Sequence, residues 1–302
     1  MWRETRRLVG VSVRTLLWTG GWLFTVSTWP GWDSAAYAEQ VAGRLSVKDA
    51  LTVPGRPVRI EARLVRSGLL GQAGLGGEQI EFLIAAKTAG TAMTGGDGRA
   101  FFEHTPRMRG NHAITVKLVT SKRVESAEAQ GTLACWERRR PILLVDTDAL
   151  AEGSRAPLIP LPSLPIEIGR QEHRAPASDA AGELKRLTDY YFNVIYLARS
   201  DRDEMDVREE TREWLKNHRF PTGPLVTMRP GRTPLVELVD RMKAEGWDNL
   251  KTGVGRTREF AETLVDLRLG VVILPATSKD EEVPPKAQVA KDWKEVRKKL
   301  QS

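Results

Sequence analysis

Pro141-Ile142-Leu143-Leu144-Val145-Asp146-Thr147-Asp148 is the stretch that decides the fold in the second half of this chain. Four apolar residues lead directly into two aspartates separated by one residue, which predicts a buried strand ending at the carboxyl edge of a sheet. Open α/β folds bind their ligands at that edge. One carboxylate there can attack phosphorus and the other can act as general acid/base, with Mg²⁺ offsetting their charge. The alternative is a buried strand that ends in a polar turn.

Downstream of this strand, helical and strand patterns alternate. Strands are expected over residues 194–198, 225–228, 252–254 and 270–274, and helices over 184–191, 209–216, 234–244 and 259–267. This alternation predicts a doubly wound parallel sheet. Residues 158–165, rich in proline and leucine, predict either a linker or a loop over the site. The charged tail from residue 279 predicts a solvated surface helix.

Upstream, residues 41–136 predict an all-β unit. Apolar residues alternate with period two over 58–65, 79–84 and 113–119, with glycine-bearing turns between them, as in a β-sandwich. Residues 77–82, 94–100 and 110–116 resemble segments of bacterial immunoglobulin-like domains, which implies an immunoglobulin-like sandwich. We therefore predict a sandwich over 41–137, an α/β domain over 138–278 and a charged tail over 279–302, with independent folding on either side of Arg138-Arg139-Arg140.

Composition narrows the class of protein. The chain has 302 residues, 41% of them hydrophobic, and a net charge of +7. Because the basic residues are scattered without interleaved aromatics, we expect no nucleic-acid partner. Cys135 is the single cysteine, which excludes an intrachain disulfide and predicts a buried small hydrophobe.

The N-terminus predicts export. Basic residues come first, an uncharged apolar run covers 15–29, and Ala36-Tyr37-Ala38 offers a signal-peptidase site. We therefore expect residues 1–38 to be removed and the mature protein to be periplasmic or secreted. The alternative is an uncleaved membrane anchor, although the apolar run is shorter than the ~20 residues that a span needs.

Four further motifs follow Asp146-Thr147-Asp148 in a fixed order: YLARS (196–200), ETREWL (210–215), FPTGPL (220–225) and TGVGR (252–256). Together they resemble the haloacid-dehalogenase superfamily over residues 141–275. Within it they are similar to the catalytic domains of lipin-type and actin-patch-type phosphatidate phosphatases.

The resemblance implies a role for each matched residue. Asp146 would form an aspartyl-phosphate and Asp148 would protonate the leaving oxygen. Phosphate binding is implied for Ser200, Arg232 and Arg256. Mg²⁺ coordination is implied for Asp146, Asp148 and Glu259.

The sequence also departs from the family. Leu150 stands where Thr or Val is expected, Ala198 stands at the usual small hydroxyl residue, and no lysine opens the helix at Arg232. Arg256 stands where an acid should hold the metal, and its guanidinium would repel Mg²⁺ or replace its charge beside an anion.

Two functions stay open at this point. The first is an exported phosphatase acting on a phosphomonoester, including a lipid-linked one. The second is a catalytically impaired module that binds an anionic ligand, or a protein partner in the cell envelope through its sandwich.

Overall fold

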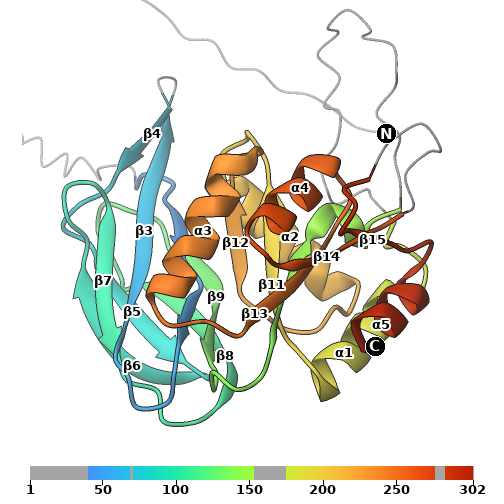
Figure 1. Ribbon diagram of the computed structural model, residues 1–302. Helices are drawn as coiled ribbons and strands as arrows, with labels where there is room; N and C mark the ends of the chain where they lie inside the picture. The colour runs from blue at the N-terminus through green and yellow to red at the C-terminus, as the bar shows by residue number, and fades with distance from the viewer. Residues whose placement is uncertain (1–39, 69–70, 153–174, 276–282, 302) are drawn as a thin grey trace, which may run out of the picture. The chain divides into compact units, whose positions relative to one another are not determined.

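The computed structural model describes residues 40–68, 71–152, 175–275 and 283–301 (Figure 1). The predicted export signal and the loop over 158–165 lie outside these ranges. No helix in the described ranges has both the length and the apolarity to cross a membrane.

The first half of the described chain forms two sheets packed face to face. In one sheet β3 pairs antiparallel with three strands, and the other has the order β2-β9-β8-β5-β6. The strands of the first sheet are β1 (Arg44–Val47), β3 (Val58–Gly68), β4 (Gly71–Gly74) and β7 (Arg99–His104). Those of the second are β2 (Ala50–Thr52), β5 (Gln79–Ile84), β6 (Lys87–Met93), β8 (Gly110–Leu118) and β9 (Glu128–Cys135).

The alternation in the sequence explains this sandwich. In β3, Ile60, Ala62 and Leu64 are fully buried, whereas Glu61 and Arg63 between them are partly exposed, so the strand turns one face to a shared apolar core. Cys135, at the end of β9, is buried as expected.

The second half is built on a parallel sheet with the order β12-β11-β10-β13-β14-β15. Its strands are β10 (Ile142–Asp146), β11 (Asn193–Arg199), β12 (Leu225–Met228), β13 (Leu250–Gly255), β14 (Gly270–Ile273) and β15 (Gln288–Val289). If these strands are renumbered in chain order with β10 as strand 1, their order in the sheet is 3-2-1-4-5-6. The direction of winding therefore reverses between β10 and β13. The predicted doubly wound sheet is present.

Helices cover both faces of this sheet (Figure 1). They are α1 (Ala180–Tyr190), α2 (Glu204–Asn217), α3 (Arg232–Ala244), α4 (Arg258–Asp266) and α5 (Trp293–Gln301). β10 is buried on both sides because Leu143 and Val145 pack in the cluster with α1, α2 and α5, whereas Ile142 and Leu144 pack in the cluster with α3 and α4.

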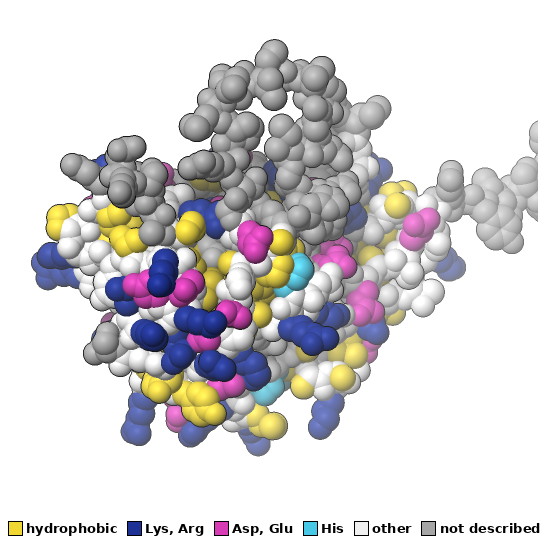
Figure 2. Space-filling model, turned by 90° about the vertical axis from the view of Figure 1, so that its right-hand side faces the viewer, with side chains coloured by type: hydrophobic (Ala, Val, Ile, Leu, Met, Phe, Trp, Pro, Cys, Tyr) yellow, Lys and Arg dark blue, Asp and Glu magenta, His cyan; other side chains and the backbone are white. Residues whose placement is uncertain are grey.

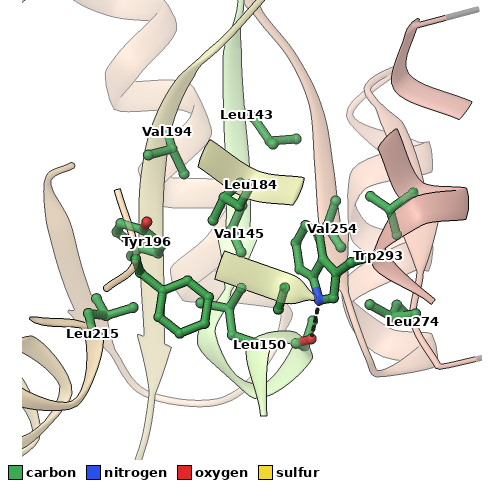
Figure 3. Packing of buried hydrophobic residues seen from close by; sticks show 14 of the residues in the cluster. Leu143, Val145, Leu150, Leu184, Val194, Tyr196, Leu215, Val254, Leu274 and Trp293 are labelled. Carbon is green, nitrogen blue, oxygen red and sulfur yellow. Dashed lines mark hydrogen bonds between the residues drawn. The ribbon is translucent and has the colours of Figure 1, made fainter. Parts of the chain in front are cut away.

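The C-terminal segment differs from the prediction. It adds β15 to the sheet, and α5 is not a solvated surface helix, because Trp293 and Val296 are buried in the core. Trp293 Nε1 donates a hydrogen bond to Ala149 O at 3.1 Å, just after β10 (Figure 3). The outward side of this region carries intermixed cations and carboxylates (Figure 2). Tyr190 and Tyr191, at the end of α1, are 78% and 46% exposed.

The sandwich and the parallel sheet meet at Asp49, which lies between β1 and β2. One of its carboxylate oxygens accepts hydrogen bonds from Thr132 N at 2.8 Å and Arg212 Nη2 at 2.7 Å. The other accepts from Leu225 N, the first residue of β12, at 2.6 Å. Trp136 of the sandwich side also packs in the apolar cluster with α3 and α4. The two halves therefore share polar and apolar contacts.

Candidate functional site

The candidate site lies where the sheet reverses its winding. Asp146 is the last residue of β10, and Arg256 directly follows β13, the neighbouring strand on the other side of the reversal. Such a switch point leaves a crevice at the carboxyl ends of the strands. A short 3₁₀ turn, η1 (Thr147–Leu150), begins directly after Asp146 and carries Asp148.

Both carboxylate oxygens of Asp146 are engaged by the protein. Oδ1 accepts a hydrogen bond from Asp148 N at 3.2 Å, which caps η1. Oδ2 accepts two from Arg199, at 3.0 Å from Nε and 2.5 Å from Nη2. Asp146 has no exposed surface, and the Arg199 side chain is 7% exposed. The two residues form a buried ion pair.

Burial dominates the electrostatics of Asp146. It raises the pKa of the Asp146 carboxyl to about 6, although the positive charge of Arg199 acts in the opposite direction. The negative charge of Asp148 raises this pKa further. Asp146 is therefore mostly ionised at neutral pH, beside a guanidinium.

Arg199 also contacts residues at the beginning of α4. Its Nη2 donates to Thr257 Oγ1 at 3.1 Å, its Nη1 lies 3.6 Å from Glu259 Oε1, and its guanidinium carbon lies 5.5 Å from the centre of the Phe260 ring. Thr257 also caps α4, because its Oγ1 accepts from Phe260 N at 3.3 Å. The guanidinium thus bridges Asp146 at the end of β10 and Glu259 in the first turn of α4.

Close packing of α4 on β13 makes this arrangement possible. A Cβ atom on Gly255 would lie 2.2 Å from Phe260 Cδ1, and one on Gly253 would lie 2.5 Å from Leu264 Cδ1. Only glycine at these two positions lets the helix come so near the strand.

The remaining predicted residues lie around this pair in different settings. Asp148 is half-buried in η1. Ser200 directly follows β11, and its Oγ accepts a hydrogen bond from Arg202 N at 3.1 Å, so it stabilises the turn before α2. Arg256 Nη2 donates to Ala151 O at 2.6 Å and so ties the end of β13 to the segment after η1. The cation that pairs with Asp146 is Arg199 rather than Arg256.

Arg232 lies in a different environment. Its Nη2 contacts Asp266 Oδ2 at 2.7 Å, and it borders a surface pocket together with Arg258 and Val283. Arg232 thus forms an ion pair with a carboxylate at the C-terminal end of α4. None of the contacts described for it involves Asp146.

The residues implied to hold Mg²⁺ do not fit a cation. Asp146 and Glu259, two of the three implied ligands, are bridged by the Arg199 guanidinium. Within the described ranges, no group of three or more His, Cys, Asp and Glu side chains could hold a metal ion. Mg²⁺ needs a near-octahedral set of oxygen ligands, and in this structure the Arg199 guanidinium lies between two of the implied ligands.

Arg199 is the residue that the sequence analysis missed. The signal was present, because an arginine ends an otherwise apolar strand next to the strand of Asp146. The register places Asp146 opposite Leu197, so Arg199 lies two residues further towards the carboxyl edge. Its side chain can therefore fold back over the end of β10.

No protein-family model and no curated protein matches this sequence. Among solved structures, D,D-heptose 1,7-bisphosphate phosphatase from B. bronchiseptica, complexed with magnesium and phosphate, is similar over 53% of this chain and 98% of its own. The identity is 10% and the TM-score is 0.42. The CARDB domain of the PF1109 protein from Pyrococcus furiosus, in complex with di-metal ions, covers 32% of this chain and 90% of its own, with 14% identity and a TM-score of 0.26.

A third similar structure is that of the fibronectin(III)-like modules of Clostridium thermocellum CbhA. It covers 30% of this chain and 94% of its own, with 11% identity and a TM-score of 0.21. The similar structures thus include a phosphatase and small modules. Likenesses at these identities and TM-scores assign no activity to this chain.

Proposed function

We propose that this chain is a phosphatase-like binding module of the cell envelope that does not hydrolyse phosphomonoesters. The observation that carries the proposal is the burial of Asp146, whose two carboxylate oxygens accept hydrogen bonds from Arg199 and from Asp148 N. Asp146 then belongs to a buried ion pair inside the protein, and the surrounding surfaces recognise a partner.

A nucleophilic carboxylate must present an oxygen lone pair to phosphorus at a distance of about 3–3.5 Å. The oxygen that faces Arg199 already accepts two hydrogen bonds, and Asp146 has no surface that a substrate can reach. Charge is not the obstacle, since a carboxyl group with a pKa of about 6 is mostly ionised at neutral pH. The obstacle is access, because Arg199 occupies the approach to the carboxylate.

The second candidate function is the phosphatase itself. It is favoured by the placement of both aspartates of Asp146-Thr147-Asp148 at the switch point, with Asp148 only half-buried. It requires Arg199 to leave Asp146, for which Glu259 offers a second carboxylate within 3.6 Å.

Turnover assays on the purified full chain separate the two functions. The substrates are p-nitrophenyl phosphate, sugar phosphates and phosphatidate vesicles, each with and without Mg²⁺. We expect wild type to show the same background rate as Asp146→Asn under both conditions. Turnover that depends on Mg²⁺ and disappears in a folded Asp146→Asn variant would establish the phosphatase instead.

A further inference from the structure

A pocket of about 330 Å³ lies at the amino edge of the parallel sheet, opposite the carboxyl edge that carries Asp146. Its lining includes residues at the beginning of β13, β14 and β15 and the residues directly before β10 and β11. The last turn of α5, which packs beside α1 (Figure 1), also lines it. We call it the amino-edge pocket. Ligand pockets span roughly 300–1,000 Å³, so this one has room for a small molecule.

One wall of the amino-edge pocket is apolar. Phe192, Val272 and Leu300 line it, and all three pack in the apolar cluster that contains the buried residues of α1 and α5. Phe192 is 8% exposed and Val272 is 2% exposed, so the core fixes their positions. We call these three residues the apolar floor. A fixed apolar surface of this kind accepts the hydrocarbon part of a ligand.

Thr252 brings a hydroxyl group to the same pocket. It is 8% exposed, and it lies on the same face of β13 as Val254, which packs in the cluster with α1 and α5. No described residue forms a hydrogen bond with Thr252 Oγ1, and this oxygen is not among the unpaired atoms that are sealed from solvent. Because polar groups in such buried residues normally have a partner, the hydroxyl is available to a ligand in the pocket.

Gly270 keeps the space beside this hydroxyl open. It lies opposite Thr252 in the register of β13 and β14. A Cβ atom on Gly270 would lie 3.0 Å from Thr252 Oγ1 and would crowd it. Gly270 does not have a positive φ, so the backbone there does not require glycine. The absence of a side chain therefore matters for the space at Thr252.

The charged lining of the amino-edge pocket is cationic. Lys251, Lys286 and Lys299 line it, and the described lining residues include no carboxylate. Lys299 Nζ lies 3.4 Å from Glu295 Oε1, and its place in the last turn of α5 also offsets the helix dipole. Lys251 and Lys286 lie outside the helices, and neither forms an ion pair with a described residue. Two exposed cations without a protein partner favour an anion in the pocket.

We propose that the amino-edge pocket binds a small organic anion with one carboxylate or phosphate head on a short apolar body. The head accepts a hydrogen bond from Thr252 Oγ1 and is attracted by Lys251 and Lys286, while the body lies on the apolar floor. Hydrogen bonds to an ionised head are stronger than those between neutral groups, so a single hydroxyl can orient it. This inference goes beyond the proposed function, because it concerns the opposite edge of the sheet and does not involve Asp146.

Calorimetric titration of the purified full chain with a series of simple anions tests the ligand class. Affinity should rise about fourfold per methylene group from butanoate to hexanoate, as each group is buried on the floor. It should then level off before decanoate, because the pocket is small. Hexan-1-ol, which lacks the charge, should bind about tenfold or more weakly than hexanoate. Hexyl phosphate, compared with hexanoate, identifies the preferred head.

Two substitutions test the place of the head. Thr252→Val keeps the shape of the side chain and removes the hydroxyl, so hexanoate affinity should fall about tenfold. Thermal unfolding should show no loss of stability, since the hydroxyl has no partner in the described chain. Gly270→Ala leaves the hydroxyl in place but crowds it, and it should also weaken hexanoate binding. A merely structural role for Thr252 would give the reverse pattern, with lower stability and unchanged affinity.

Charge is tested with a matched pair of lysines. Lys286→Gln should weaken hexanoate binding severalfold and reduce its dependence on salt. Lys298→Gln removes an exposed cation of α5 that is not part of the pocket lining, so it should leave binding unchanged. Circular dichroism of each variant confirms that the fold is retained.

Four outcomes would overturn the proposal. Neither hexanoate nor hexyl phosphate could bind, or hexan-1-ol could bind as tightly as hexanoate. Affinity could be the same in Thr252→Val, Lys286→Gln and wild type, which would place binding elsewhere. Affinity could also keep rising to decanoate, which would indicate a lipid chain instead of a small ligand.

Hexanoate also separates this inference from the proposed function. It contains no phosphate ester, so its binding is measured whether or not the protein hydrolyses phosphomonoesters. Asp146→Asn should bind hexanoate with wild-type affinity, because Asp146 lies at the other edge of the sheet. Mg²⁺-dependent turnover would overturn the proposed function and leave the amino-edge pocket unaffected.

Discussion

Arg199 donates to a single carboxylate oxygen of Asp146 through two nitrogen atoms, at 3.0 Å from Nε and 2.5 Å from Nη2. The pair joins the ends of two adjacent strands, β10 and β11, in the interior of the protein. Taking both charges out of water is unfavourable, and their mutual attraction offsets that only in good geometry. The pair therefore makes the carboxyl edge of the sheet sensitive to the loss of either partner.

Removal of Arg199 alone should destabilise the protein. We expect Arg199→Met to lower the free energy of unfolding by about 3–5 kcal/mol, because it leaves a buried carboxyl without its cation. Asp146→Asn combined with Arg199→Met removes both charges and should recover much of the loss. Urea denaturation of wild type and of these two variants measures this. Equal stability of the single and double variants would show that the pair is not coupled.

Asp146 should also make stability depend on pH. Its pKa is raised in the folded protein from 3.8 to about 6, so between these values the folded chain holds a proton that the unfolded chain has lost. This stabilising contribution is fully present below about pH 4 and is lost as the pH rises through 6. The stability of wild type relative to Asp146→Asn should therefore fall by about 3 kcal/mol between pH 4 and pH 7. A difference that is constant with pH would contradict the raised pKa.

Asp49 should be needed for the contact between the sandwich and the parallel sheet. Asp49→Ala leaves Thr132 N, Leu225 N and the Arg212 guanidinium without their common acceptor. We expect a loss of about 2–4 kcal/mol in urea denaturation, with exposed Asp201→Ala as the control. If Asp49→Ala behaves like Asp201→Ala, water replaces the carboxylate at this contact.

Trp293 should stabilise the core through packing more than through its hydrogen bond. Trp293→Ala opens a cavity among fully buried residues and should cost about 3–5 kcal/mol. Trp293→Phe keeps most of the ring and loses the hydrogen bond to Ala149 O, so its cost should be about 1 kcal/mol. Tyr190→Ala, at a site that is 78% exposed, is the control. Equal losses for Trp293→Ala and Trp293→Phe would mean that the hydrogen bond dominates.

The strands and most helices were predictable because their apolar periods are local. The run from Ile142 to Asp146 predicts β10 directly. α2 begins five residues earlier than expected, because the side chain of Asp203 caps it by accepting hydrogen bonds from Met205 N and Asp206 N. β15 was missed because two residues carry no detectable period. The burial of α5 was signalled by Trp293, Val296 and Leu300 on one helical face, but the surrounding charges obscured it.

Long-range pairings were not predictable from local patterns. Arg199 and Asp146 are 53 residues apart, and Asp49 and Leu225 are 176 apart, so their contacts depend on strand order and register. The roles implied for Asp148, Ser200 and Arg256 remain predictions, as does the boundary near Arg138. Fragments covering residues 39–137 and 138–302 test that boundary, and the contacts of Asp49 and Trp136 suggest how the halves could depend on each other.

The position of α5 has a consequence for biosynthesis. Trp293 caps the region just after β10, yet it is made 144 residues later than Ala149. At elongation rates of about 5–20 residues per second, roughly 7 to 30 s separate the two events on the ribosome. Throughout that interval the nascent chain carries the apolar side chains of Leu143 and Val145 without their last cover. During this period chaperones would recognise the exposed apolar side chains of the growing polypeptide. A pause in translation would lengthen the period and so favour aggregation.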